Sequence, residues 1–184
     1  VIEENGAYYN RMLWVKPDGH VEQYDKRHLF RMAKENEYYK EGSTRLITSI
    51  QDWRICPLVC YDLRFPVWSR NVDWRINIEP RHQYEVLIYV ANWPERRNHA
   101  WKSLLVARAI ENQCYVIGVN RIGTDGNDIA YSGDSMVINP LGEIISKTKA
   151  HQEAVESVNL NLKELLDYRV AFPAIQDADA FEMK

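Results

Sequence analysis

The chain has 184 residues, of which 46% are hydrophobic and 27% charged, a composition typical of a globular domain. Its 23 Lys and Arg residues against 26 Asp and Glu residues give a net charge of −3, which argues against a nucleic-acid-binding protein or a polybasic membrane anchor. Apolar runs are too short to span a bilayer, and three cysteines are too few for a disulfide scaffold. These features predict a cytoplasmic α/β protein with one domain over residues 1–184.

The first part of the chain alternates between strand-like runs and irregular polar segments. Residues 7–25 are predicted to form a hairpin around a Pro-Asp-Gly turn. Residues 26–45 have no clean period, so we expect a long loop or an irregular helix, and long loops in compact domains tend to be functional. Residues 53–60 form an apolar run that predicts a buried strand, in which Pro57 indicates a bulge or a sheet edge.

The second part contains a strand–helix–strand unit. Residues 84–91 and 113–120 are strand-like, and residues 98–113 between them place apolar side chains on one helical face. This order predicts a right-handed crossover with the helix packed on the sheet. Around this unit we expect a short helix with a surface insertion over 66–83, a hairpin over 135–147, a last strand over 154–160, and a tail over 161–184.

Cys60 is the first candidate for chemistry. It ends the apolar run and precedes a polar turn, and a nucleophile on a sharp strand-to-helix turn faces solvent beside its neighbour's backbone N–H. A buried structural cysteine is the commoner role of a free thiol, and composition alone favours it. Cys56 and Cys114 lie inside apolar strand patterns, where that structural role is expected. The spacing of Cys56 and Cys60 does not match a zinc site, and no metal is expected.

The polar loop supplies a second group of candidates. An ammonium at Lys26 would lower the pKa of a nearby thiol or hold a developing oxyanion, with a solvated surface lysine as the alternative. Glu35, Glu37 and Glu41 follow, and any one of them is a candidate catalytic carboxylate unless the loop is simply solvated. No serine nucleophile motif, phosphate-binding glycine loop or dinucleotide fingerprint is present, so no cofactor is expected.

Five blocks of sequence, taken together, resemble the carbon–nitrogen hydrolase (nitrilase-like) family. They are YDKRHLF at 24–30, CPLVCYDLRFP at 56–66, VANWPERR at 90–97, ARAIENQCYVIGVNRIG at 107–123 and YSGDSMVINPLGEII at 131–145. The strings KRHLFRMA and FPAIQDAD are most similar to the omega-amidase branch, whose members hydrolyse the side-chain amide of 2-oxo acids.

The resemblance implies an α/β fold, namely a four-layer α-β-β-α sandwich, and a catalytic cysteine, lysine and glutamate, often with a second glutamate. Cys60 matches the nucleophile and Lys26 the lysine. Glu37, five residues before Gly42, is the best match for the second glutamate, and Glu41 is the weaker one. The first glutamate belongs to an N-terminal motif that has no counterpart here, so we expect an N-terminally incomplete domain.

The implied reaction is hydrolysis of 2-oxoglutaramate or 2-oxosuccinamate through a thioester. Lys26 and the backbone N–H of Tyr61 would hold the oxyanion, and the glutamate would activate first the thiol and then water. Glu37 would orient the substrate nitrogen or hold Lys26. We therefore expect Glu37→Gln to cost less activity than Cys60→Ala.

Three further residues are candidates for the substrate pocket. Arg64 is a candidate clamp for the distal carboxylate of the substrate, with an ion pair to Asp62 or Glu95 as the alternative. Asn92 and Trp93 follow a predicted strand end, where they would line the pocket or, alternatively, form the turn and pack in the core.

Other interpretations stay open at this point. The same family includes carbamoylases, other small-amide hydrolases and nitrilases, and the absent glutamate would also fit a catalytically silent binding protein or fragment. A thiol redox module built on Cys56 and Cys60 is disfavoured by their spacing. The expected partners are a small amide substrate and a second copy of the chain, because the family pairs subunits through the helix at 98–113 and the C-terminal tail.

Overall fold

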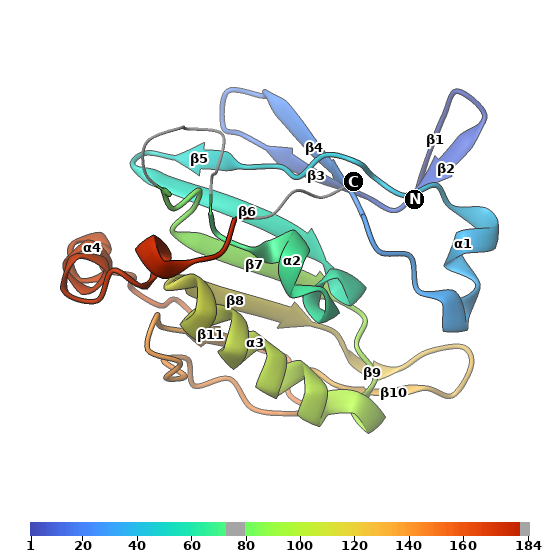
Figure 1. Ribbon diagram of the computed structural model, residues 1–184. Coiled ribbons are helices and arrows are strands. Elements are labelled where there is room, and N and C mark those ends of the chain that lie inside the picture. The colour runs from blue at the N-terminus through green and yellow to red at the C-terminus, as the bar shows by residue number, and fades with distance from the viewer. Residues whose placement is uncertain (73–79, 181–184) are drawn as a thin grey trace.

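The computed structural model describes residues 1–72 and 80–180, and a five-stranded sheet lies at its centre (Figure 1). The three middle strands are parallel, and the two outer strands run antiparallel to them. In spatial order the strands are β11 (Met136–Ile138), β8 (Tyr115–Asn120), β7 (Val86–Ala91), β6 (Trp53–Val59) and β5 (Thr48–Ile50).

Side chains of the middle strands alternate between two faces, because successive residues of a strand point in opposite directions. Helix α3 (Asn98–Asn112) covers one face and buries Trp101 and Leu105 completely (Figure 1). The approach is close, since a side chain at Gly118 of β8 would meet Leu105 at 2.4 Å. On the other face, Leu165 of α4 (Leu162–Ala171) packs in a smaller cluster against all three middle strands.

The predicted β7–α3–β8 unit is confirmed, and it determines where chemistry can occur. Parallel strands place their carboxyl ends at one edge of the sheet, and ligands of open α/β sheets bind outside that edge. Here β6, β7 and β8 end at Val59, Ala91 and Asn120, on the right-hand side of Figure 1. The segments that follow these strands therefore lie close together.

Three two-stranded sheets surround the central one. They are β1 (Ile2–Glu4) with β2 (Ala7–Tyr9), β3 (Arg11–Val15) with β4 (Val21–Asp25), and β9 (Ile122–Thr124) with β10 (Ala130–Ser132). The hairpin predicted over residues 7–25 is thus only partly right. Its second half is the β3–β4 hairpin, whereas residues 7–9 pair with the preceding strand.

Other predictions have mixed outcomes. The hairpin over 135–147 is present as β11 with an isolated bridge between Ile138 and Ile144. No strand forms at 154–160, most of whose residues are exposed. The short helix after Cys60 is α2 (Pro66–Ser69), and the insertion predicted next falls largely on 73–79, outside the described residues.

Pro57 lies in β6, a strand of the sheet interior, yet it does not break the pairing. β5 pairs only with Trp53–Ile55, so at Pro57 the described part of the chain supplies a strand neighbour on one side alone. A missing N–H is tolerated at such a sheet edge, as predicted. None of the helices within the described ranges combines the length and the apolar character needed to cross a bilayer.

Candidate active site

Cys60 lies at a sharp turn between β6 and the 3-10 turn Cys60–Arg64. Its φ of 46° is in the left-handed region, where a residue other than glycine is strained by about 1–2 kcal/mol. This turn brings the thiol to the edge of the sheet, where Sγ donates a long hydrogen bond to the carbonyl oxygen of Asn92 at 3.9 Å. The strain is therefore located at the residue that the sequence analysis identifies as the nucleophile.

Lys26 directly follows β4 and is almost completely buried, with 2% of its surface exposed. Its ammonium lies 2.6 Å from Glu35 Oε2, and the same oxygen accepts the backbone N–H of Phe30 at 2.8 Å. A charge buried this deeply is stable only with a partner, so the two side chains hold each other in place. Lys26, Glu35 and Cys60 all line one cavity.

The expectation that Glu37 lies beside Lys26 is not met. Glu35 begins the short helix α1 (Glu35–Tyr38), and residues two apart in a helix point to different sides. Glu37 is accordingly exposed, 3.9 Å from Lys34. The weaker candidate, Glu41, lines a separate cavity.

Burial raises the pKa of the Cys60 thiol above its ordinary value, and the nearby Lys26 ammonium only partly offsets this effect. The thiol is therefore protonated at neutral pH in this environment. A nucleophilic role for it requires a base that removes the proton as the bond to the substrate forms.

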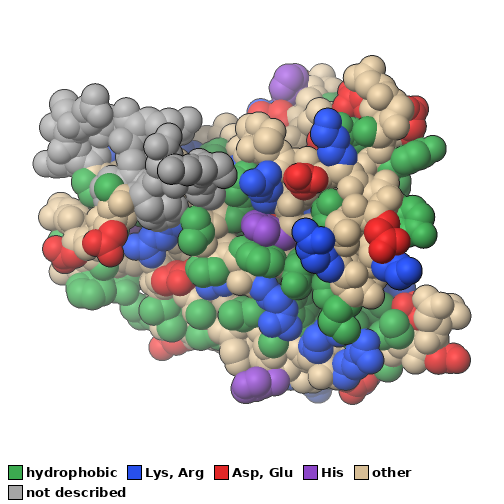
Figure 2. All heavy atoms as spheres, turned by 45° about the vertical axis from the view of Figure 1, so that its right-hand side comes forward, with side chains coloured by type: hydrophobic (Ala, Val, Ile, Leu, Met, Phe, Trp, Pro, Cys, Tyr) green, Lys and Arg blue, Asp and Glu red, His purple; other side chains and the backbone are tan. Residues whose placement is uncertain are grey.

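The cavity has a volume of about 680 Å³ and opens at the carboxyl edge of the sheet. On the face of the molecule turned forward in Figure 2, Lys and Arg side chains gather around hydrophobic surface. Besides Cys60, Lys26 and Glu35, the cavity is lined by polar side chains from several segments, namely Asn92, Arg96, Arg97, Asp125, Asn127 and Tyr131.

The remaining predicted pocket residues lie around a smaller cavity of about 30 Å³ that also borders Cys60. Trp93 is 3% exposed and donates its backbone N–H to Asn120 Oδ1, so it is mainly a core residue. The Arg64 guanidinium lies over its ring at 5.0 Å. The Tyr61 ring packs edge-on against Phe30 at 4.9 Å. Asn92 borders both cavities.

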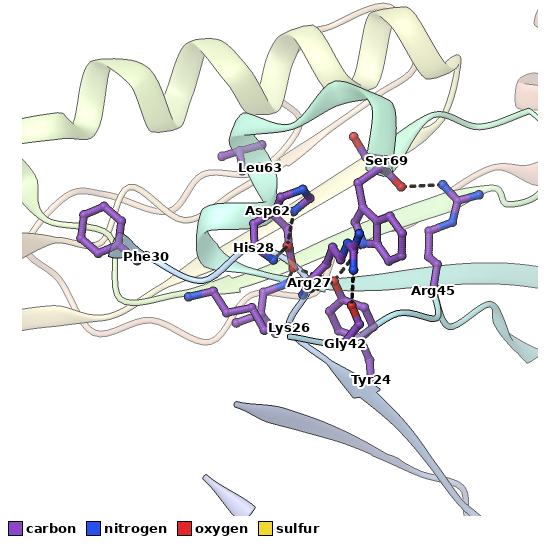
Figure 3. A network of polar contacts seen from close by, with 12 residues as sticks. Tyr24, Lys26, Arg27, His28, Phe30, Gly42, Arg45, Asp62, Leu63 and Ser69 are labelled. Carbon is purple, nitrogen blue, oxygen red and sulfur yellow. Dashed lines mark hydrogen bonds and ion pairs between the residues drawn. The ribbon is translucent and has the colours of Figure 1, made fainter. Parts of the chain in front are cut away.

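Asp62, which the sequence analysis considered only as an ion-pair partner, joins the two strands that carry Cys60 and Lys26. Its carboxylate is fully buried and accepts the Tyr24 hydroxyl at 2.7 Å, the Val59 N–H at 3.1 Å and the His28 N–H at 3.0 Å (Figure 3). It thereby connects the end of β6 to the end of β4. Instead of pairing with Arg64, it fixes the position of the ammonium relative to the thiol.

The loop between Lys26 and Gly42 is closed at its base. Gly42 donates its N–H to the Lys26 carbonyl at 3.0 Å, and its own carbonyl accepts from Arg27 Nη1 at 3.0 Å (Figure 3). A Cβ at this position would lie 2.1 Å from the Asp25 carbonyl oxygen, so only glycine allows the contact. The loop that carries Glu35 therefore begins and ends at the same place.

The cysteines also provide a test of the redox alternative. Cys56 and Cys114 are completely buried, and burial raises the pKa of Cys56 to about 12, whereas Cys60 reaches the cavity. We expect iodoacetamide to modify Cys60 alone in the folded protein, as peptide mass mapping would show. Comparable modification of Cys56 and Cys60 would contradict this assignment and favour a dithiol module.

No group of three or more His, Cys, Asp or Glu side chains in the described ranges is arranged to hold a metal ion. The site instead combines a thiol at a strained turn, a buried ammonium–carboxylate pair and a polar cavity. Such an arrangement suits nucleophilic attack on a carbonyl carbon, with the ammonium facing the charge that develops on the oxygen.

Comparisons with known proteins agree with this chemistry. Omega-amidase YafV of Escherichia coli (strain K12) is 55% identical over 182 residues, which cover 99% of this chain and 68% of that protein. The 2-oxoglutaramate amidase of Bacillus subtilis (strain 168) is 32% identical over 96% of this chain and 65% of its own length. Among solved structures, this chain matches XC1258 of Xanthomonas campestris, a CN-hydrolase superfamily protein with an arsenic adduct in its active site. The TM-score is 0.94 at 44% sequence identity, and the match covers 100% of this chain and 68% of that one.

The predicted α/β fold class is confirmed by that structural match. A model of the carbon-nitrogen hydrolase family also matches residues 1–170. The match extends from the first strand to the last full helix, and it includes the turn at Cys60 and the buried Lys26. This chain belongs to the carbon–nitrogen hydrolase family.

Proposed function

We propose that residues 1–184 belong to a single carbon–nitrogen hydrolase domain that acts as an omega-amidase. It hydrolyses the side-chain amide of 2-oxoglutaramate or 2-oxosuccinamate to the acid and ammonia. The observation that carries this proposal is that Cys60, Lys26 and Glu35 meet in one cavity of a chain that is 55% identical to an omega-amidase.

In the proposed mechanism, Cys60 Sγ gives its proton to a base as it forms a bond to the amide carbon, and the C=O electron pair moves to the oxygen. The Lys26 ammonium and the Tyr61 backbone N–H stabilise this oxyanion. The C–N bond then breaks as the nitrogen takes a proton and leaves as ammonia, and water hydrolyses the thioester. The resemblance assigns the base for these proton transfers to a glutamate of a motif that has no counterpart in these 184 residues.

Glu35 is proposed as the positioning residue for Lys26. Its contacts with the Lys26 ammonium and the Phe30 N–H hold the ammonium toward the cavity. We expect Glu35→Gln to lower kcat by about 10²-fold, the usual consequence of misplacing a catalytic group by about 1 Å. Glu37→Gln is the matched control and should leave kcat within about twofold, because surface changes away from such contacts are usually small.

Steady-state kinetics of both variants would check this assignment, with circular dichroism to verify folding. A larger loss from Glu37→Gln than from Glu35→Gln would contradict it and return the role to Glu37.

A substrate panel tests the proposal itself. The purified protein would be incubated with 2-oxoglutaramate, 2-oxosuccinamate, an N-carbamoyl amino acid and an aliphatic nitrile, with ammonia measured for each. We expect the two 2-oxo amides to be the best substrates, and added hydroxylamine to divert the thioester to a hydroxamate. Preferred release from the carbamoyl compound or the nitrile would favour the related activities. Silence with all four would favour the binding-protein alternative.

We also propose that the protein acts as a homodimer in the cytoplasm. Exposed apolar side chains near the expected interface support the pairing, namely Ile110 of α3 and Leu166, Val170 and Phe172 at and beyond α4. Three free cysteines fit a reducing compartment. Sedimentation equilibrium at twice the 21.7 kDa chain mass would support the dimer, and a monomeric mass would contradict it.

A further inference from the structure

Three arginines converge on the cavities beside Cys60. Arg64 follows the nucleophile turn, whereas Arg96 and Arg97 belong to the 3-10 turn after β7. Arg96 lines the main cavity, Arg64 lines the small one, and Arg97 lines both. Arg97 therefore lies where the two cavities meet, and Cys60 borders both of them as well.

These guanidinium groups are not satisfied by other side chains in the described part of the protein. Other arginines of the described part pair with a carboxylate, as Arg11 does with Asp25 at 2.7 Å and Arg108 with Glu111 at 2.9 Å. For Arg64, Arg96 and Arg97 the described residues provide no ion pair and no side-chain hydrogen bond.

A cation–π contact holds Arg97 without a hydrogen-bond acceptor. Its guanidinium lies 5.2 Å from the centre of the Phe30 ring, and this contact does not use its N–H donors. Burial, together with repulsion from Arg96 and Arg64, lowers the pKa of Arg97. An anion bound there would relieve this repulsion and satisfy the free donors.

We infer that Arg97 binds the carboxylate of the substrate at the end opposite the scissile amide, with Arg64 and Arg96 adding to the positive potential. This inference rests on the proposed function and changes one part of it, because the sequence analysis assigned the clamp to Arg64. A guanidinium holds a carboxylate through two parallel hydrogen bonds, which fixes both the position and the direction of the substrate. The amide carbon is then directed toward Cys60.

The consequence is selection by charge. A short amide with a carboxylate gains the Arg97 contact, whereas a neutral amide of similar length leaves the arginine cluster uncompensated. The preferred substrates are therefore short monoamides of dicarboxylic acids.

The kinetic test compares Arg97→Gln with the matched control Arg31→Gln. Arg31 also has no ion-pair partner among the described residues, but it borders a different cavity. We expect Arg97→Gln to lower kcat/KM for 2-oxoglutaramate by about 10–100-fold, the usual worth of a hydrogen bond to a charged group, mostly through KM. Its kcat/KM for the neutral amide butyramide should stay within about twofold. Arg97→Lys should recover part of the loss. An equal loss on both amides, or none on 2-oxoglutaramate, would overturn the inference.

A binding measurement separates this inference from the proposed activity. The dicarboxylate 2-oxoglutarate has no amide, so its binding requires no catalysis. We expect it to raise the Tm of the wild-type protein and of Arg31→Gln, but not that of Arg97→Gln. An equal rise in all three proteins, or no rise in the wild type, would contradict the clamp whatever the outcome of the amidase assay. Loss of ammonia release with this binding pattern intact would contradict the proposed function alone.

Discussion

Replacing Cys60 with alanine is expected to abolish ammonia release from 2-oxoglutaramate, with kcat lowered by about 10⁶-fold, as for removal of the nucleophile in other covalent catalysts. Without Sγ no thioester forms, and water in the cavity would have to attack the amide directly. The variant should keep its fold, because alanine and cysteine carry the same backbone strain at a φ of 46°. Ammonia release measured alongside thermal unfolding would check both expectations.

Two outcomes would contradict the assignment of Cys60 as the nucleophile. Persistent ammonia release from Cys60→Ala, with hydroxamate still formed in the presence of hydroxylamine, would mean that another side chain forms the acyl intermediate. Loss of activity together with a large fall in Tm would instead assign Cys60 a structural role.

Replacing Lys26 with methionine should damage both activity and stability. We expect kcat to fall by about 10²–10³-fold, because one donor to the developing oxyanion is lost. The free energy of unfolding should fall by about 3–5 kcal/mol, because the largely buried Glu35 carboxylate loses the charge that offsets its burial. Denaturant unfolding and steady-state kinetics would measure the two losses separately.

A double variant distinguishes the two effects. Adding Glu35→Gln to Lys26→Met removes the unpaired charge, so much of the stability should return while kcat stays low. Recovery of activity along with stability would show that Lys26 acts only by supporting the fold.

The central part of the fold could be predicted because its signals are local. β7, α3 and β8 begin and end within two residues of the predicted segments, since apolar runs and helical spacing determine them directly. The region 154–160 has a similar pattern but forms no strand, and Val155 is fully exposed. Alternation alone does not produce a strand, because a strand also needs a neighbouring strand to pair with, and residues 154–160 pair with none of the described strands.

The site could be predicted in part, through the resemblance of sequence blocks rather than through any single residue. Cys60 and Lys26 occupy one cavity as expected. Glu37 is the best match in sequence because it lies five residues before Gly42, whereas only the helical turn at α1 decides which carboxylate faces Lys26. Arg97 and Asp62 were missed in their present roles, because their significance depends on contacts with residues about 30 or more positions away in sequence.

The left-handed backbone at Cys60 has an evolutionary consequence. Glycine adopts this conformation without strain, so selection for folding alone would favour glycine at position 60. A lineage that no longer needed the reaction would gain stability by losing its nucleophile. Cysteine at position 60 therefore costs folding free energy that glycine would not, and the proposed reaction gives a reason for that cost.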